Sequence, residues 1–492
     1  MKKLFLNYQV QEYENAFFNK GNSDKELMLK AADVASKFII KNTDYKKFIC
    51  VCGPGNNGGD GYYIGISLSR LGFKVSIIDA LNEKKKSPLC NDAFDEANKN
   101  KLMHDASILN EGSSKTAIVD AVFGTSLKGP LNKSLVDLIN SMNSYDQIFS
   151  IDIPSGINPN TGVELETSIC ANKTISFVGR KVGLALNQGK ISAGEINFHD
   201  LGLNMKDEIK EFATSYKFLD IKDLIVKRSA NTHKGNYGRI LVIGGDENMG
   251  GAAIMASEMA LKSGSGLVSL LTQKDHIKAS LERNPEIMAI SFEALKDKDP
   301  ILETADVVVC GPGLSESLWS EELIKKTMQH LTNINSPAIF DAGALRYIAK
   351  DPNSIKGLNG SIILTPHPGE AAALLSISTN EVQLDRIEAA KKLALKYNAT
   401  IILKGSGTII VHKDKIYVCE EGGPELATGG TGDILAGLVG SLIAQGLSEV
   451  NASLLAVATH GAAGNEFMKL HGENGLAATE LIPLIRKKLN NK

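Results

Sequence analysis

The sequence contains no uninterrupted apolar run approaching the ~18 residues that a membrane-spanning helix needs. A signal peptide is not expected either. The apolar run near the N-terminus is shorter than the usual ~7–15 residues, and Glu12 and Glu14 follow it. Cysteine is scarce, with six in 492 residues, which is too few for a disulfide framework. These absences predict a protein of the cytoplasm.

Two of the cysteines, Cys50 and Cys52, lie two positions apart in an apolar run. Alternation along a strand places both side chains on one face. No second cysteine pair is present to complete a zinc site. We therefore interpret both as core residues.

The sequence also lacks an excess of charge. Lys and Arg total 54 and Asp and Glu total 56, so the formal net charge is −2. This balance provides no global attraction to nucleic acid or to an anionic membrane. Hydrophobic residues make up 43% and charged residues 22%, as in ordinary globular proteins. The length allows two large domains or about three smaller ones.

The first half alternates short apolar runs with stretches of helical periodicity, which predicts an α/β fold with a parallel sheet and crossover helices. A helix up to Leu71 follows the first strand. The segment from Asn204 to Lys234 is polar and has no clear strand, so we place the domain boundary there and expect domains at 1–215 and 225–492. The predicted strands are 47–51, 73–80, 116–123, 147–153 and 173–178.

The second half restarts the same alternation, so a second α/β domain is predicted. Its motifs differ from those of the first half, which argues against a simple duplication. Helices are predicted at about 251–263, 433–446 and 453–468. The predicted strands are 238–245, 266–272, 306–313, 337–343, 361–366, 400–407 and 408–411.

A glycine-rich loop, CGPGNNGGDG at 52–61, connects the first predicted strand to its helix. It matches neither the standard dinucleotide-binding spacing nor a phosphate loop that ends in Gly-Lys-Ser/Thr. Glycine lets the backbone approach a ligand, and the oxygens of Asn56, Asn57 and Asp60 suit a hard cation or a sugar hydroxyl. A tight turn that merely needs glycine is the alternative.

Two further strand ends carry polar residues. Asp120 lies in VDAVFGTSLKGPL (119–131), and Asp152 and Ser155 lie in SIDIPSG (150–156). Ligands of open α/β sheets bind beyond the carboxyl ends of the strands. We therefore expect that Asn57, Asp120 and Ser155 could share one monovalent cation. Asp152 would then be a base or an acceptor for a ribose hydroxyl, although each aspartate alone could be a cap or turn residue.

These strings resemble the N-terminal YjeF family, the NAD(P)H-hydrate epimerases, in the family's order across about residues 1–215. The resemblance implies a Rossmann-like three-layer αβα domain that interconverts the R and S forms of hydrated NADH or NADPH. It also implies potassium held by Asn57, Asp120 and Ser155, with Asp152 as the candidate catalytic residue. The substrate is implied to contact Asn56, Asn57, Gly58, Gly59, Asp60, Gly124, Thr125, Ser126, Leu127, Lys128, Gly129, Pro130 and Asp152.

In the second half, GGPELATGGTGDILAGLVG at 422–440 leads from glycines directly into an apolar helix. Free backbone N–H groups at a helix N-terminus bind anions, here a transferring phosphoryl group. Asp433, in the first turn, is placed to take a proton from an attacking hydroxyl. Phosphoryl transfer needs this combination of charge stabilisation and a positioned base. A helix cap is the alternative role for Asp433.

Other motifs agree with this interpretation. Lys404 lies at the bend of a predicted hairpin in LKGSGTIIV (403–411), where it suits nucleotide phosphates. His367 and Glu370 lie in the proline-bounded TPHPGE loop (365–370), which could also be a structural turn.

Five strings in order resemble the ADP- or ATP-dependent NAD(P)H-hydrate dehydratases of the ribokinase-like superfamily: HKGNYGRILVIGG, GPGL, LTPHPGE, LKGSGT and ATGGTGD, over about residues 225–492. The last string alone would leave sugar, pyridoxal and thiazole kinases open. The resemblance implies a ribokinase-like αβα domain that uses ADP or ATP with Mg²⁺. The hydrated nucleotide is implied to contact Ala252, Gly313, His367 and Asp433. The adenine nucleotide is implied to contact Lys404, Gly405, Ser406, Gly407, Thr408 and Gly432.

Two positions depart from the family pattern. Gly343, in DAGAL (341–345), replaces the second acid of a frequent Asp-Ala-Asp pattern, which leaves open any metal or water role of that acid. Glu425 stands where small or apolar residues are common, so the loop shape is expected to differ.

Together the halves predict one repair activity, in which the epimerase supplies the S hydrate to the dehydratase. Asp433 would activate the ring hydroxyl to attack the terminal phosphoryl group, and the resulting phosphate ester would leave. The partners are small molecules, and the resemblance implies a homo-oligomer. Two alternatives stay open: a ribokinase-class kinase with an accessory nucleotide-binding domain, and a non-catalytic nucleotide sensor. The sequence decides neither between ADP and ATP nor between NADH-hydrate and NADPH-hydrate.

Overall fold

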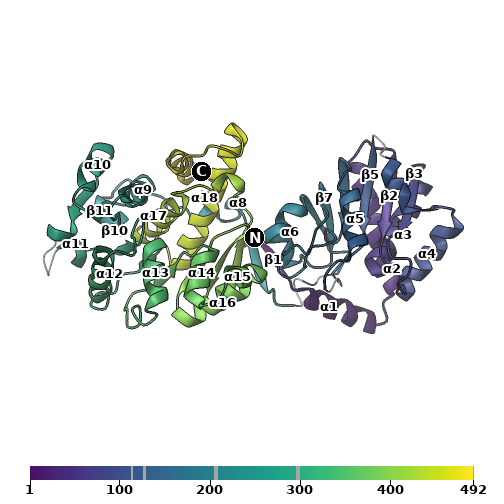
Figure 1. Ribbon diagram of the computed structural model, residues 1–492, viewed down its shortest axis with the longest axis horizontal. Helices are drawn as coiled ribbons and strands as arrows, with labels where there is room; N and C mark the ends of the chain where they lie inside the picture. The colour runs from purple at the N-terminus through teal and green to yellow at the C-terminus, as the bar shows by residue number, and fades with distance from the viewer. Residues whose placement is uncertain (112–114, 126–128, 204, 206–208, 295–299, 491–492) are drawn as a thin grey trace. The chain divides into compact units, whose positions relative to one another are not determined.

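The computed structural model describes residues 1–492 except 112–114, 126–128, 204, 206–208, 295–299 and 491–492. The chain forms two compact units (Figure 1). The N-terminal unit comprises Lys3–Ala213, and the C-terminal unit comprises Thr214–Lys492 together with Met1–Lys2. The strand β9 (Ala213–Tyr216) lies at this boundary, where the sequence predicted no strand. Its sequence, ATSY, is mostly small and polar, so the sequence alone gives little indication of a strand; in the structure it pairs in parallel with β18.

The N-terminal unit contains a seven-stranded sheet in the order β4-β3-β2-β5-β6-β7-β8, and all its strand pairs are parallel. The five predicted strands are present; β4 and β8 were not predicted. The strand order reverses between β2 and β5, so ligands are expected beyond the carboxyl ends of these strands. The strands are β2 (Lys47–Cys52), β3 (Lys74–Asp79), β4 (Met103–His104), β5 (Thr116–Ala121), β6 (Gln147–Ile151), β7 (Lys173–Phe177) and β8 (Glu195–His199).

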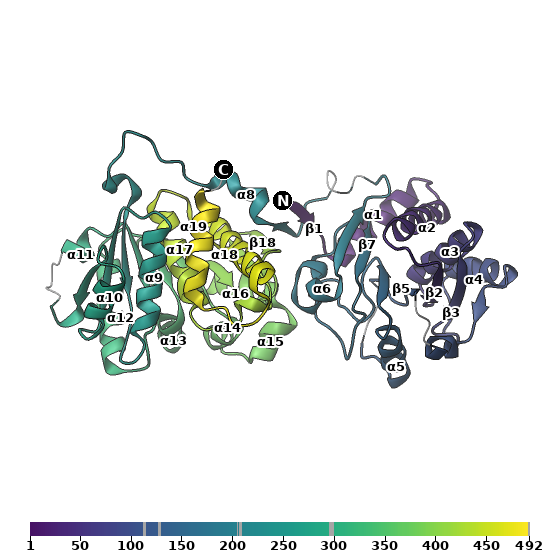
Figure 2. The ribbon, with the colours of Figure 1, turned by 90° about the horizontal axis from the view of Figure 1, so that it is seen from above.

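Helices cover both faces of this sheet (Figure 2). Cys50 and Cys52 are buried on one face, against α1 to α4, and Ile49 and Val51 point to the other face, against α5. The prediction that both cysteines are core residues is confirmed. The helices are α1 (Asn7–Asn19), α2 (Asp24–Lys41), α3 (Asn56–Arg70), α4 (Pro88–Lys99), α5 (Lys133–Met142) and α6 (Asn187–Ser192).

The larger sheet has eleven strands in the order β1-β9-β18-β17-β16-β15-β14-β13-β10-β11-β12. Its strands from β10 to β16 pair in parallel, and β16, β17 and β18 form antiparallel hairpins. The order reverses between β10 and β13, which defines a second switch point. The strands are β1 (Lys2–Leu4), β10 (Arg239–Ile243), β11 (Leu267–Thr272), β12 (Met288–Ser291), β13 (Val307–Cys310), β14 (Ala338–Phe340), β15 (Ile362–Leu364), β16 (Thr400–Leu403), β17 (Thr408–His412) and β18 (Lys415–Cys419).

One face of the strands in the C-terminal unit packs against α9, α17, α18 and α19, while α12, α13, α14 and α16 lie along the other (Figure 1). A Cβ atom on Gly437 of α17 would lie 2.1 Å from the Ala256 carbonyl oxygen of α9, so glycine lets these helices touch. The helices are α8 (Phe218–Ile221), α9 (Gly250–Lys262), α10 (His276–Arg283), α11 (Pro300–Glu303), α12 (Leu318–Leu331), α13 (Ala342–Lys350), α14 (Pro368–Leu375), α15 (Thr379–Leu384), α16 (Arg386–Tyr397), α17 (Thr431–Ala444), α18 (Glu449–His471) and α19 (Leu481–Asn490).

Several predicted elements have different ends in the structure. The predicted strand 400–407 ends at Leu403, because Gly405 and Gly407 have positive φ angles and turn the chain into β17. The helix predicted from 433 begins at Thr431. The helix predicted over 453–468 extends over Glu449–His471, with Ser448 as its N-cap.

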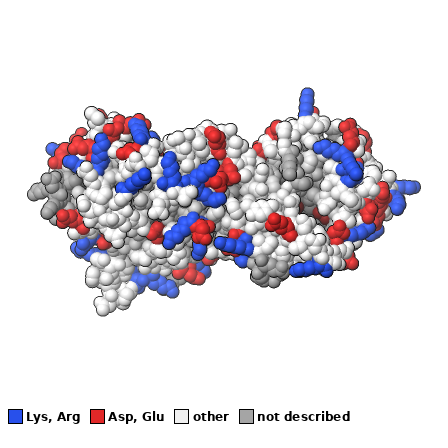
Figure 3. Space-filling view, turned by 90° about the horizontal axis from the view of Figure 1, so that it is seen from below, with Lys and Arg blue, Asp and Glu red and all other residues white. Residues whose placement is uncertain are grey.

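The surface carries acidic and basic side chains close to one another. Figure 3 shows the two kinds interspersed on its visible face, in keeping with the net charge of −2. Among the described residues, no helix is both long and apolar enough to cross a membrane.

Candidate active sites

A cavity of about 620 Å³ lies beside the carboxyl ends of β2, β5 and β6 in the N-terminal unit. Gly58 and Gly59 are buried in α3 and do not line it, and Gly129 and Pro130 are exposed and do not line it. The predicted residues Ser126, Leu127 and Lys128 lie outside the described residues. The predicted substrate residues that do line the cavity are Asn56, Asn57, Asp60, Gly124, Thr125 and Asp152.

The buried glycines of the 52–61 loop serve packing. A Cβ atom on Gly58 would lie 1.8 Å from the Gly53 carbonyl oxygen, and one on Gly61 would lie 2.5 Å from the Cβ atom of Ala121. Glycine therefore allows the first turn of α3 to approach the ends of β2 and β5. Gly58 thus packs closely against Gly53, and its contact with the substrate stays a prediction.

Asp120 and Ser155 form a buried hydrogen-bonded pair. The Ser155 hydroxyl donates to Asp120 Oδ1 at 2.5 Å, and the Ser155 amide donates to Oδ2 at 2.9 Å. Ser150 Oγ also donates to Oδ2, at 2.8 Å. Burial raises the pKa of Asp120, and these hydrogen bonds oppose that rise. A carboxylate in this position is stabilised by a neighbouring cation.

Asn57 supplies a further oxygen at this place. Both polar atoms of its amide are buried and have no hydrogen-bond partner among the described residues. Its Cβ atom lies 3.0 Å from the position that a Cβ atom on Gly124 would occupy, which puts it at the end of β5. Buried amides normally have partners, so the orphaned Asn57 indicates a ligand. The described residues hold no group of three or more His, Cys, Asp or Glu that could bind a metal. Asn57, Asp120 and Ser155 offer oxygen atoms, which are the ligands that hard cations prefer.

Asp152 forms an ion pair that the sequence did not predict. It follows β6 with a φ of +69°, and its Oδ1 accepts hydrogen bonds from the Lys181 ammonium and, at 3.2 Å, from the Phe177 amide. Lys181 is buried, and its Nζ also donates to the Phe177 carbonyl at 2.9 Å. Both charged side chains line the same cavity, so the pair can hold or move a proton there.

Two more carboxyl groups of this cavity have shifted pKa values. Burial raises the pKa of Glu14 to about 7, with Lys181 lowering it and Asp152 raising it. Burial, Asp152 and Glu14 raise the pKa of Asp60 well above its usual value. The sequence alone does not indicate Glu14 and Lys181, because neither belongs to a glycine loop or a strand end and only the fold brings them to Asp152.

In the C-terminal unit, Asp433 lies in the first turn of α17. The N-cap is Gly430, whose φ of +93° belongs to the left-handed region that favours glycine. Asp433 makes no capping hydrogen bond within the described chain. Burial and the neighbouring Asp341 raise the pKa of Asp433 to about 7, while Lys404 opposes this rise. The carboxyl group is thus poised to exchange a proton near neutral pH.

Lys404 is held between two acids. Its Nζ lies 2.9 Å from Asp341 Oδ1 and 3.9 Å from Glu370 Oε2. Burial alone would lower the pKa of Lys404, but Asp341 and Glu370 raise it, so the ammonium stays charged. The Thr365 hydroxyl donates to Asp341 at 2.7 Å and fixes that carboxylate.

The predicted nucleotide residues come together in the fold. Residues 404–407 form the turn between β16 and β17, and Thr408 begins β17. A Cβ atom on Gly432 would lie 3.3 Å from Lys404 Nζ, so this turn meets the start of α17.

The predicted hydrate residues come from four places in the C-terminal unit: α9, the loop after β13, the N-cap of α14 and the first turn of α17. Cβ atoms at Gly313 and Ala252 would be 3.1 Å apart, and Met255, one turn along α9 from Ala252, would meet a Cβ atom on Gly430 at 2.7 Å. His367 is exposed and caps α14: its Nδ1 accepts from the amides of Gly369 at 3.0 Å and Glu370 at 3.3 Å. The capping role agrees with the alternative of a structural turn, and Nε2 of the same ring lies 3.4 Å from Glu370 Oε1.

The two departures from the family pattern have physical reasons. A Cβ atom on Gly343 would lie 2.3 Å from the Leu314 carbonyl oxygen, so an acidic side chain has no room there. Glu425 is buried, and its Oε1 accepts from the Gly423 amide at 3.0 Å, which shapes the loop before α17.

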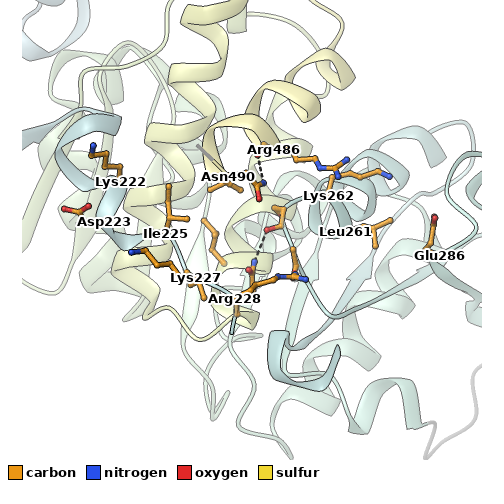
Figure 4. A pocket seen from close by; sticks show the side chains of 16 residues that line it. Lys222, Asp223, Ile225, Lys227, Arg228, Leu261, Lys262, Glu286, Arg486 and Asn490 are labelled. Carbon is orange, nitrogen blue, oxygen red and sulfur yellow. Dashed lines mark hydrogen bonds between the residues drawn. The ribbon is translucent and has the colours of Figure 1, made fainter. Parts of the chain in front are cut away.

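The C-terminal unit also holds a cavity of about 1020 Å³ away from these residues (Figure 4). Segment 222–228, α19 and the C-terminal ends of α9 and α17 line it. Gln445 lies at that end of α17, whereas Asp433 lies about 18 Å away along the helix axis. None of the predicted site residues lines this cavity. We therefore do not regard it as the candidate active site, although it is larger than the cavity of the N-terminal unit.

The N-terminal unit is Rossmann-like and the C-terminal unit is ribokinase-like, and each brings acid–base residues to the carboxyl ends of its parallel strands. The family described as "NAD(P)H-hydrate dehydratase" matches residues 240–487, and the family described as "YjeF-related protein N-terminus" matches residues 24–183. The chain belongs to the bifunctional NAD(P)H-hydrate repair enzymes. It is 37% identical over its whole length to "Bifunctional NAD(P)H-hydrate repair enzyme Nnr" of Coxiella burnetii, which it covers completely. It is 34% identical to the protein of that name from Escherichia coli, over 94% of this chain and 89% of the other.

Solved structures resemble the C-terminal part. The ADP/ATP-dependent NAD(P)H-hydrate dehydratase of Bacillus subtilis, co-crystallised with ATP/Mg²⁺, is 30% identical with a TM-score of 0.51, covering 56% of this chain and 97% of that chain. A ribokinase-like superfamily protein of Enterococcus faecalis is 26% identical with a TM-score of 0.53, covering 57% and 96%. A kinase with an accessory domain would leave the match of residues 24–183 unexplained.

Proposed function

We propose that the chain repairs hydrated NADH and NADPH through the residues described above. The N-terminal unit interconverts the R and S hydrates, and the C-terminal unit dehydrates the S form with ADP or ATP. The observation that carries this proposal is Asp433. Its carboxyl group, with a pKa of about 7, stands at the start of α17 in a chain that matches the repair enzymes over its whole length.

In the C-terminal unit, Asp433 accepts the proton of the ring hydroxyl. The hydroxyl oxygen bonds to the terminal phosphorus, whose bond to the bridging oxygen of the nucleotide breaks. The C–O bond of the new phosphate ester then breaks, the adjacent ring carbon gives up a proton to the departing phosphate, and the dihydronicotinamide double bond returns. Phosphate leaves more readily than hydroxide, which explains the need for a nucleotide.

The developing negative charge lies between Lys404 and the free N–H groups of α17, both of which stabilise it. Magnesium would be held by the nucleotide phosphates and by Asp341 or Glu370, because Mg²⁺ prefers carboxylate and phosphate oxygens. It would neutralise phosphate charge. Ala252, Gly313 and His367 would contact the hydrate, and residues 404–408 with Gly432 the adenine nucleotide.

In the N-terminal unit, inversion requires the ring hydroxyl to leave one face and water to add to the other. The leaving oxygen needs a proton and the incoming water must lose one. Asp152 and Lys181 are hydrogen-bonded to each other in the cavity and serve this transfer, with Glu14 as a second group that exchanges protons near pH 7. Potassium would be held by Asn57, Asp120 and Ser155, and would neutralise the buried carboxylate beside the substrate.

We further expect small-molecule partners only, a homo-oligomer and action in the cytoplasm.

An optical assay tests the proposal. The purified chain receives mixed R and S NADH hydrate, Mg²⁺ and either ADP or ATP, and the return of the dihydronicotinamide absorbance is followed. Conversion of the whole mixture is expected. Conversion that stops at the S fraction would contradict the epimerase half, and absence of conversion with either nucleotide would contradict the dehydratase half.

A further inference from the structure

Arg386, the first residue of α16, has one of the largest fully buried side chains of the protein, with 2% of its surface exposed. A buried guanidinium is costly unless hydrogen bonds satisfy it. Burial lowers the pKa of Arg386 to about 10, so the group keeps its charge at neutral pH.

The partners of Arg386 lie in the turn between β16 and β17. Its Nη1 donates to the Ser406 carbonyl at 2.6 Å, and its Nη2 donates to the carbonyls of Lys404 at 3.1 Å and Leu403 at 3.3 Å. A Cβ atom on Gly405 would lie 2.6 Å from Nη2, so the guanidinium lies directly against the backbone of the turn.

These contacts orient the peptide groups of the turn. In a planar trans peptide, the N–H of one residue points opposite to the carbonyl of the residue before it. Since Arg386 holds the carbonyls of Lys404 and Ser406, the amides of Gly405 and Gly407 point away from it. Neither amide donates a hydrogen bond within the described part of the chain. The Lys404 amide, in contrast, donates to the Pro366 carbonyl at 2.9 Å.

We propose that Arg386 is a positioning residue for nucleotide binding. It holds the carbonyls of Leu403, Lys404 and Ser406 on one side of the turn, so that the amides of Gly405 and Gly407 face a phosphate of ADP or ATP beside Lys404. Backbone amides that converge on one side of a glycine turn bind phosphate oxygens. The proposal rests on the nucleotide-dependent dehydratase function proposed above. The planar guanidinium of arginine orients this turn better than a lysine ammonium would, because it donates to several carbonyls at fixed geometry.

The test uses the full chain and the variant Arg386→Lys, which keeps the charge but loses the fork. The KM for ADP or ATP is expected to rise about tenfold or more, with kcat within about twofold, because the variant weakens binding of the nucleotide and leaves Asp433 in place. Affinity for the S hydrate, measured without nucleotide, is expected to stay unchanged. Arg228→Lys is the control, since Arg228 donates to the Gly264 carbonyl at 2.5 Å at the opposite end of α9 from the hydrate residues.

An unchanged KM for the nucleotide in Arg386→Lys would overturn the proposal. So would a parallel loss of hydrate and nucleotide affinity in Arg386→Met, because that pattern indicates a structural role only. If the unaltered chain neither binds ADP or ATP nor uses them, the proposed dehydratase function fails first, which separates that failure from one confined to Arg386.

Discussion

Asp433 shows how a single residue acquires its chemistry from its surroundings. Its carboxyl group is buried at a helix N-terminus near Asp341 and Lys404, and its pKa rises to about 7. Replacement by Asn keeps the shape and removes the base. We expect kcat of the dehydratase to fall by about 10²–10⁴-fold in Asp433→Asn. The exposed Asp275→Asn serves as the matched control, and equal activity of the two variants would exclude Asp433 as the base.

The same residue predicts the pH dependence of the C-terminal unit. Because the base must be unprotonated, kcat/KM for the S hydrate is expected to rise with pH and to level off above about 7. A profile that is flat between pH 5.5 and 8 would contradict this assignment.

The stability of the C-terminal unit is expected to fall with rising pH, whereas its activity is expected to rise. The folded-state pKa of Asp433 lies above its ordinary value, so the carboxyl stabilises the fold when protonated, and this contribution is lost as pH rises through about 7. Asp433→Asn is therefore expected to be more stable than the unaltered chain at pH 8, by up to about 4 kcal/mol, and by less than half of that amount at pH 5. Denaturant titrations at the two pH values measure this, and a difference that does not grow with pH would refute it.

Asn57 and Lys181 support separate predictions for the N-terminal unit. Because the buried Asn57 amide has no hydrogen-bond partner among the described residues, potassium is expected to stabilise this unit by about 1.4 kcal/mol at ten times its dissociation constant. Asn57→Leu should remove the difference in thermal midpoint between KCl and choline chloride. If the variant keeps that difference, Asn57 is not a ligand.

Lys181→Met should lower the epimerase rate about 100-fold or more, because it removes the proton partner of Asp152. Dehydration of the S form should be unchanged, which serves as the internal control. Equal loss of both activities would indicate general damage.

At the scale of single elements, α17 contributes both to the candidate active site of the C-terminal unit and to its hydrophobic core. Its first turn carries Asp433, and its middle packs against α9 through Gly437, where a Cβ atom would lie 2.1 Å from the Ala256 carbonyl oxygen. Gly437→Ala is therefore expected to destabilise the C-terminal unit by about 2–3 kcal/mol, since the backbones must separate. Gly251→Ala in α9 meets nothing within 4 Å and is the control, with no loss expected. Similar denaturation midpoints for both variants would show that α9 and α17 can move apart at little cost in stability.

The elements also show what could be predicted. The central strands of both sheets could be predicted from apolar runs, because a strand that is buried on both faces has a continuous hydrophobic sequence. The strands β8, β9 and β18 were missed. The short sequences of β8 and β9 carry too few apolar residues in a row to predict a strand, whereas β18 does include such a run. Of the three, only β8 lies at the edge of its sheet.

For the whole molecule, the two activities belong to separate compact units, each with its own sheet and core. The hydrate is a small molecule that can leave one site and enter the other through solvent. An equimolar mixture of Lys181→Met and Asp433→Asn is therefore expected to convert both hydrates completely, although neither variant does so alone. Following the absorbance of the mixture tests this, and failure to exceed the S fraction would mean that both sites must lie in one molecule.

The sequence by itself determined the two α/β halves, the order of their motifs and the residues at the ends of the central strands. These features are local, because hydrophobic periodicity and glycine loops are properties of neighbouring residues. Only the tertiary structure decided which distant groups meet: Lys181 and Glu14 at Asp152, Asp341 and Glu370 at Lys404, and Arg386 beneath the turn at Gly405. Burial and neighbouring charges shift the pKa values of the catalytic carboxyl groups, and the contacts of Arg386 orient the amides of the turn. The spacing of residues along the sequence does not show which side chains are buried or which distant residues become neighbours in the fold.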